Sequence, residues 1–255
     1  MINRKTTREI ELMRSAGRIA AEARELAGKL VTVGTTTRSI DKAVHEFLIS
    51  KGAIPSFLGY RDYPASTCIS VNDEVIHGIP GSRKLKQGDI VSIDIGATKN
   101  GYIGDCSATF IAGKGSIESE KLIKVTRECF YEGLKFAIPG NRVSAISRAI
   151  QQHAEANGFS VVREYTGHGV GNKVHESPEV PNYVKTPRKG PDPRLLSGMT
   201  LAIEPMVNMG SADIKVLDDG WTVITADRKN SAHYENTILI TDGEPEILTI
   251  CEGMP

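Results

Sequence analysis

An order of segments that occurs twice is the feature that most constrains how this chain folds. Residues 34–52 and 140–158 are equally long, begin and end with glycine, and carry apolar residues at helical spacing between the glycines. Further along, LKQGDIVSID ends at Asp94 and LLSGMTLAIE ends at Glu204, so an acidic residue closes both copies of a second motif. Two matches in the same order at nearly constant offset indicate an internal duplication. The sequence therefore predicts two related halves, with Asp94 and Glu204 in equivalent places.

Each half reads as two helices followed by strands. The first helix opens with a capping box, in which the side chains of Thr6 and Glu9 accept from each other's backbone N–H groups. Apolar residues three and four apart predict helices at about residues 6–30, 37–50, 118–136 and 143–157. Segments rich in β-formers and turn residues follow each helix pair. We therefore expect one α+β domain, residues 1–255, whose halves span about 1–113 and 114–255 around a shared sheet.

An Asn-Gly pair predicts the hairpin that carries two aspartates. Type I′ turns need positive φ at both central residues, so Asn100-Gly101 between alternating apolar segments is a strong hairpin signal. Counting outward from that turn puts Asp94 and Asp105 on one face as diagonal neighbours, about 7–8 Å apart at Cα. Two like charges side by side repel unless a cation lies between them or water surrounds them. The hairpin alone leaves a metal site and a solvated face as alternatives.

Further candidate ligands come from the second half. Glu204 ends an apolar segment, Glu235 begins an apolar strand, and His168 lies among glycines that let backbone approach a ligand closely. An isolated charge is very costly to bury, so carboxylates at the edges of buried strands point to a bound cation. With Asp94 and Asp105, the four carboxylates carry a charge that two divalent ions would neutralise. Oxygen-rich ligation with a single imidazole favours Mn(II), Fe(II), Co(II) or Mg(II) over structural zinc.

The other histidines divide into two groups. His77 and His175 lie in glycine-rich motifs, which makes them candidates for binding. His45 and His153 follow helical patterns, so we expect surface or packed residues there. His233 lies two residues before a candidate ligand and shares its side of the strand, yet a solvated strand histidine is the simpler expectation.

Composition narrows the class of protein. The chain has 31 basic and 31 acidic residues, so charge gives no reason to expect binding to DNA or to a membrane. The N-terminus is charged and no apolar run approaches ~18 residues, which predicts a soluble, cytoplasmic protein that we expect to be a monomer. No C-x-x-C pair occurs, so each of the four cysteines is expected to be a small buried residue: Cys68, Cys106, Cys129 and Cys251.

Six motifs are spread over nearly the whole chain: VIHGIP at residues 75–80, IDIG at 93–96, GD at 104–105, GHGVGNKVHESP at 167–178, GMTLAIEPMV at 198–207 and YE at 234–235. In kind, order and spacing they resemble the motifs of the type I methionine aminopeptidases in their short, bacterial-style form. The resemblance implies a pita-bread fold, with two pseudo-symmetric helix-helix-strand halves around a curved, mainly antiparallel sheet.

The resemblance also implies roles for the candidate residues. It implies a dinuclear site for two divalent ions such as Co, Mn or Fe(II), with five ligands: Asp94, Asp105, His168, Glu204 and Glu235. A metal-bound hydroxide would attack the first peptide bond, and Glu204 would also relay protons. His175 would stabilise the developing oxyanion, and His77 would contact the scissile amide.

A pocket for the methionine side chain follows from the same resemblance, built by Phe57, Tyr60, Tyr63, Cys68 and Trp221. The alternative is that Trp221 and Cys68 are core residues and that the tyrosines only pack a loop. Phe57 stands where a smaller residue is often found, and Val174 precedes His175 where an aromatic is frequent. These departures concern the shape of the pocket rather than the ligands.

The implied activity is removal of the initiator methionine from the N-termini of nascent polypeptides, with preference for a small second residue. An Xaa-Pro aminopeptidase or proline dipeptidase of the same fold is one alternative, and a metal-free binding module of that fold is another. The Pro-rich, basic residues 185–194 predict an exposed loop. Transient association with the ribosome through this loop is a further hypothesis.

Overall fold

The computed structural model describes residues 2–184 and 190–251. Within them, α-helices form at the four predicted places: α1 Thr7–Leu30, α2 Thr37–Ser50, α3 Ile117–Leu134 and α4 Val143–Ala156. The capping box that begins α1 is confirmed, because Thr6 and Glu9 each accept a hydrogen bond from the other's backbone N–H. No helix in the described ranges is long and apolar enough to cross a membrane.

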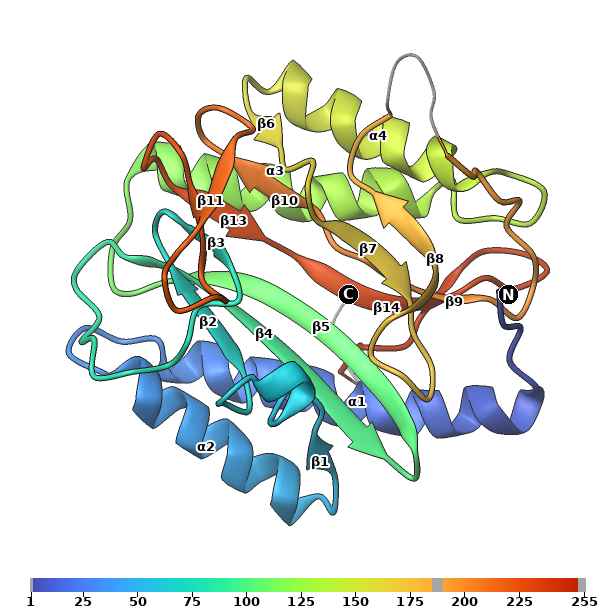
Figure 1. The fold of residues 1–255 in the computed structure, drawn as a ribbon, viewed down its shortest axis with the longest axis horizontal. Helices are drawn as coiled ribbons and strands as arrows, with labels where there is room; N and C mark the ends of the chain where they lie inside the picture. Colours follow the sequence, from blue (N-terminus) through green and yellow to red (C-terminus); the bar gives the residue numbers. More distant parts are fainter. Residues whose placement is uncertain (1, 185–189, 252–255) are drawn as a thin grey trace.

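A curved, nine-stranded sheet lies at the centre of the molecule (Figure 1), in the order β1-β4-β5-β14-β9-β7-β8, with β2 also paired to β4 and β15 to β14. Its strands are β1 Ile54–Pro55, β2 Cys68–Val71, β4 Ile90–Lys99, β5 Tyr102–Ile111, β7 Thr166–Gly169, β8 Glu176–Pro181, β9 Thr200–Ile203, β14 Glu235–Leu239 and β15 Glu246–Ile247. Every pairing in it is antiparallel.

Two three-stranded sheets complete the β-structure of the described residues, in the orders β13-β10-β6 and β11-β12-β3. Their strands are β3 Glu74–Ile76, β6 Ser160–Val161, β10 Met206–Asn208, β11 Ile214–Val216, β12 Val223–Thr225 and β13 Ser231–His233. A short 3-10 helix, η1, spans Tyr60–Asp62.

The hairpin of β4 and β5 has the predicted register. Lys99 faces Tyr102 and Asp94 faces Ser107 across the two strands. The turn residues have the positive φ that a type I′ turn requires, 52° at Asn100 and 81° at Gly101. The Asn-Gly signal therefore fixed both the turn and the face on which Asp94 lies.

The two copies of the duplicated motif have the same local structure. Gly34 and Gly140 adopt φ of 90° and 89°, and Gly88 and Gly198 adopt φ of 85° and 87°. Figure 1 shows α1 and α2 along the bottom of the sheet and α3 and α4 along the top. Each helix pair buries its apolar stripe against strands of the central sheet, α1 and α2 with β4, and α3 and α4 with β9 and β14.

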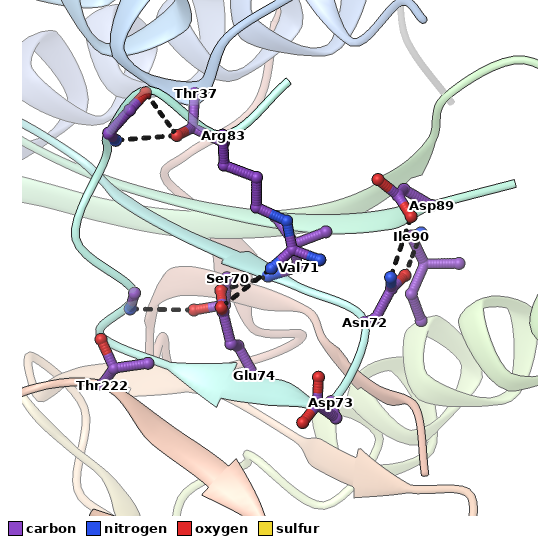
Figure 2. A network of polar contacts seen from close by, with 12 residues as sticks. Thr37, Ser70, Val71, Asn72, Asp73, Glu74, Arg83, Asp89, Ile90 and Thr222 are labelled. Atoms are coloured by element: carbon purple, nitrogen blue, oxygen red, sulfur yellow. Dashed lines mark hydrogen bonds and ion pairs between the residues drawn. The ribbon is translucent and has the colours of Figure 1, made fainter. Parts of the chain in front are cut away.

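A polar network fixes the turn between β2 and β3, shortly before His77 (Figure 2). Asn72 has a positive φ of 62°, and its side-chain amide donates to Asp89 Oδ1 at 2.9 Å. Glu74 Oε2 accepts from the backbone N–H of Val71 at 2.8 Å. These bonds hold the backbone of the turn that leads into β3.

Two expectations from the sequence concern the cysteines and the predicted loop. Cys68, Cys106 and Cys129 are buried as expected, but Cys251 is only partly buried because it follows the last strand pairing of the chain. The predicted exposed loop over residues 185–194 lies partly outside the described residues, and Arg194 is exposed.

Candidate metal centre

Three carboxylates meet on one face of the central sheet because of strand register. Ser107 of β5 faces Asp94 of β4 on one side and Glu235 of β14 on the other. Side chains at directly paired positions point to the same face, and so does a residue two positions along the strand. Asp105 is that residue, so it lies on the same face as Asp94 and Glu235.

The second half adds an imidazole and a fourth carboxylate. His168 of β7 is paired with Ala202 of β9, two residues before Glu204. His168 Nε2 lies 3.4 Å from Glu204 Oε1. One ligand atom each from Asp105, His168 and Glu235 fall within 4.8 Å of one another. Strands that are far apart in the sequence therefore gather five candidate ligands at one place.

The tautomer of His168 follows from its hydrogen bond. Its Nδ1 lies 2.9 Å from the carbonyl oxygen of Gly169, and a carbonyl only accepts, so Nδ1 carries the proton. Burial and then the neighbouring His175 lower the pKa of His168 to about 3, which keeps the ring neutral. The lone pair of Nε2 is thus directed to the carboxylates, as in a metal-ligating histidine.

Electrostatics show that the cluster suits a cation. Burial and then the charge of Glu204 raise the pKa of Asp94 to about 8, and burial raises the pKa of Asp105 and of Glu235 well above their usual range. Asp94 Oδ1 and Asp105 Oδ1 are buried without any hydrogen-bond partner among the described residues. Oxygens left without partners beside other carboxylates are costly unless a cation binds them. The donor set therefore fits a divalent metal ion.

His233 corrects an expectation. It is 2% exposed rather than solvated, and its Nε2 lies 3.7 Å from Glu204 Oε2. Pairing of β13 with β10 turns this strand inward, because His233 faces Met206 across the ladder. Burial and then the nearby His77 lower the pKa of His233 to about 3. The sequence signal for this position was the spacing of two residues from Glu235, because residues i and i+2 of a strand point to the same face.

His77 and His175 lie beside the ligand cluster. The ring of His175 is 4.3 Å from that of His168, centroid to centroid, and its Nδ1 is 2.9 Å from the hydroxyl oxygen of Tyr60. His77 has a φ of 59°, a left-handed conformation that is strained for a residue with a Cβ and is found most often at functional sites. Its ring packs edge-on against Trp221 at 6.0 Å.

One cavity of about 270 Å³ joins these groups to an apolar pocket. All the residues expected to form the methionine pocket line it: Phe57, Tyr60, Tyr63, Cys68 and Trp221. Trp221 is half-buried, its ring meets that of Tyr63 edge-on at 5.0 Å, and both residues line the cavity. The ligands and both histidines line the same cavity.

Phe57 occupies its place because of a glycine. A Cβ built on Gly96 would lie 2.8 Å from Phe57 Cε1, closer than real contacts allow. The missing side chain at position 96 therefore makes room for the larger ring at position 57. The sequence showed the large residue at position 57 but not its contact with position 96.

Sequence reasoning missed the rim of the cavity. Arg61, Glu164, Tyr165 and Thr166 line it as well. Arg61 has a φ of 49°, an unfavourable conformation that the neighbouring sequence does not predict. Tyr165 and Thr166 directly precede the GHG motif, so their closeness to His168 along the chain was the available signal.

Comparisons with known proteins agree with this geometry. The model of metallopeptidase family M24 matches residues 11–242 of this chain. The chain belongs to metallopeptidase family M24. Among M24 proteins, it is 56% identical to a methionine aminopeptidase of Clostridium perfringens, over 98% of this chain and 99% of that protein. It is 53% identical to methionine aminopeptidase 1 of Bacillus subtilis, over 98% of this chain and 99% of that one.

Solved structures of M24 proteins confirm the fold. A methionine aminopeptidase from Thermotoga maritima superposes with a TM-score of 0.94 at 44% identity, covering 98% of this chain and 99% of that one. A prolidase from Pyrococcus furiosus superposes with a TM-score of 0.78 at 24% identity, covering 98% of this chain and 66% of the prolidase, which shows a shared fold alone. The expected α+β pita-bread architecture is thus confirmed, as is membership of a metal-dependent peptidase family.

Proposed function

We propose that this chain removes the N-terminal methionine from newly made polypeptides and prefers a small second residue. The observation that carries the proposal is the single cavity, which joins a cluster of four carboxylates and an imidazole to a pocket lined by aromatic side chains. Relatives named methionine aminopeptidase, up to 56% identical and matched over nearly their whole length, support the choice of substrate.

In this proposal two divalent ions bind to Asp94, Asp105, His168, Glu204 and Glu235. Two such ions balance the four carboxylate charges. When bound, they supply a Lewis acid for the scissile carbonyl and lower the pKa of a water molecule. Both halves of one domain, residues 1–255, contribute ligands, two from about 1–113 and three from about 114–255.

The side chains of the chain itself position the substrate and move protons. Burial raises the pKa of Glu204 well above its usual range in the metal-free protein. With cations bound beside it the carboxylate would be ionised and could accept a proton from the attacking water. Glu204 would then return this proton to the nitrogen of the leaving amine, so no net charge builds up. The His168 and His233 rings lie beside it, with their Nε2 atoms 3.4 and 3.7 Å from its two oxygens.

His175 is assigned to the oxygen of the scissile carbonyl. If the Tyr60 hydroxyl donates to His175 Nδ1 across their 2.9 Å contact, the ring proton is on Nε2 and is available to the developing negative charge. His77 would contact the scissile amide from the opposite wall, next to Trp221. The methionine side chain would lie among Phe57 and its aromatic neighbours.

Steady-state assays of the metal-loaded protein test the proposal. We expect turnover of Met-Ala-Ser and none of an Xaa-Pro peptide that does not begin with methionine. Asp105→Asn, which keeps the shape of the side chain but removes its charge, is the matched control and should be inactive. Cleavage of the Xaa-Pro peptide alone would replace this proposal by an Xaa-Pro peptidase, and absence of any turnover would indicate a binding module.

We place the action of the protein in the cytoplasm because ribosomes release its substrates there. We further propose that it acts as a monomer. Transient ribosome association is part of this proposal and is supported only by basic residues, of which Arg194 is exposed. Co-sedimentation with ribosomes should fall when Lys185, Arg188, Lys189 and Arg194 are neutralised together. Unchanged co-sedimentation would dispose of that idea without affecting the peptidase assignment.

A further inference from the structure

A second cavity of about 270 Å³ lies on the other side of the central sheet from the candidate ligands. It lies where α1 and α3 face β5 and β14, and Figure 1 shows these two helices flanking those strands. Successive residues of a strand point to opposite faces, so Glu235 points to the ligand cluster and Asn236 to this cavity. Neither the peptidase chemistry nor the methionine pocket makes use of it.

The floor of this cavity holds a buried guanidinium. Arg24 of α1 is 8% exposed, and its Nη1 donates to Asn236 Oδ1 at 2.9 Å and to the backbone carbonyl of Glu235 at 3.4 Å. Among the described residues, its nearest carboxylate is Glu25, with Oε1 3.9 Å from Arg24 Nε. That separation exceeds a hydrogen bond, so a buried positive charge stays incompletely compensated.

A second guanidinium stands at the mouth. Arg127 of α3 is exposed and lies over the ring of Tyr131, with Cζ 5.6 Å from the ring centroid. Arg24 Cζ lies 6.0 Å from the centroid of Tyr234. The charged groups among the described lining residues are two guanidiniums and the carboxylate of Glu25, which leaves a net charge of +1.

We propose that this cavity binds a phosphate-sized oxyanion, either inorganic phosphate or a phosphate monoester, between Arg24 and Arg127. A guanidinium presents a planar fork of donors that matches phosphate oxygens, and it loses less hydration than an ammonium on burial. The rings of Tyr131 and Tyr234 line the same cavity beside the two guanidiniums. An anion here would balance the net charge of +1 that the described lining residues carry.

Calorimetric titration of the metal-loaded protein with inorganic phosphate, at fixed ionic strength against chloride, tests the proposal. Arg127→Gln should weaken phosphate binding by about tenfold or more, because a charge-assisted hydrogen bond is lost at the mouth. Arg148→Gln removes the same charge from an exposed position on α4 and should bind phosphate like the parent. Because Arg127 is exposed, its replacement leaves the fold intact even if Arg24→Gln does not.

Three results would overturn the proposal. These are parental phosphate affinity in Arg127→Gln, absence of phosphate binding in the parent, and binding that Asp105→Asn abolishes while Arg127→Gln retains it. The last pattern would place phosphate at the metal ligands. A parallel titration with O-phosphoserine separates the two sources of the anion. Binding about tenfold tighter than that of phosphate assigns a monoester, and equal or weaker binding assigns free phosphate.

Discussion

Lys5→Met is predicted to loosen the segment that carries His175. Lys5 Nζ lies 2.7 Å from Glu176 Oε2, and the two side chains are 2% and 11% exposed. The other oxygen of Glu176 accepts from the backbone N–H of Asn172 at 3.1 Å and of Lys173 at 3.4 Å. This ion pair therefore fastens the chain before α1 to the loop that ends in His175.

The size of the effect follows from this burial. Removing one partner of a buried ion pair costs about 3–5 kcal/mol. Glu176 keeps its two backbone donors, so we expect a loss of about 3 kcal/mol in the free energy of unfolding. For a chain of this size that corresponds to a fall in Tm of roughly 6–12 °C. We expect kcat for Met-Ala-Ser to fall more than KM rises, because the proposed function assigns His175 to the reacting carbonyl.

Lys51→Met is the matched control, measured by scanning calorimetry at the same metal loading. Lys51 Nζ pairs with Glu22 Oε2 at 2.6 Å, but these side chains are 43% and 36% exposed. Exposed pairs contribute about 1 kcal/mol or less, so its Tm should change little. Equal falls in Tm for the two variants, or an unchanged kcat in Lys5→Met, would refute the reasoning from burial.

Further predictions concern the site itself. Asp105→Ala should abolish turnover and most metal binding, whereas His77→Ala should spare metal binding, as measured by metal content after dialysis, and lower kcat. Gly96→Ala should raise KM for Met-Ala-Ser, since its Cβ would lie 2.8 Å from Phe57 Cε1, and Phe57→Leu in the same chain should restore it; a parental KM in Gly96→Ala would contradict this. The raised pKa of Asp94, about 8, means that the metal-free folded state holds a proton that the unfolded state has lost. Stability of chelated protein should therefore fall as pH rises from about 7.5 towards 8, above the range in which unfolded histidines titrate, and melts in excess Mn²⁺ should remove this slope.

Local signals in the sequence sufficed for the helices and the central hairpin. The capping box at Thr6 and the Asn100-Gly101 turn act between neighbours in the chain, so they hold whatever the rest of the fold does. The register counted from that turn also placed Asp94 and Asp105 on one face. Residues that depend only on such local geometry were predictable without knowledge of the sheet order.

Features that depend on long-range packing were not predictable in this way. The burial of His233 requires β13 to pair with β10, and the link between Phe57 and Gly96 requires β1 to lie beside β4. Arg24 is a clearer case, because it has helical spacing with the buried Ala20 and Ala27 and a charged residue there reads as an interruption of the apolar stripe. Its hydrogen bonds to Asn236 and to the carbonyl of Glu235 on β14, which is distant in the sequence, explain its place.

Anomalous diffraction from crystals grown with Mn²⁺ is the most direct test of the claim that the carboxylate cluster is a metal centre. The account predicts two manganese peaks about 3.5–4 Å apart, bound by Asp94, Asp105, His168, Glu204 and Glu235. Crystals of protein that cleaves Met-Ala-Ser, yet show no manganese among these side chains, would contradict it.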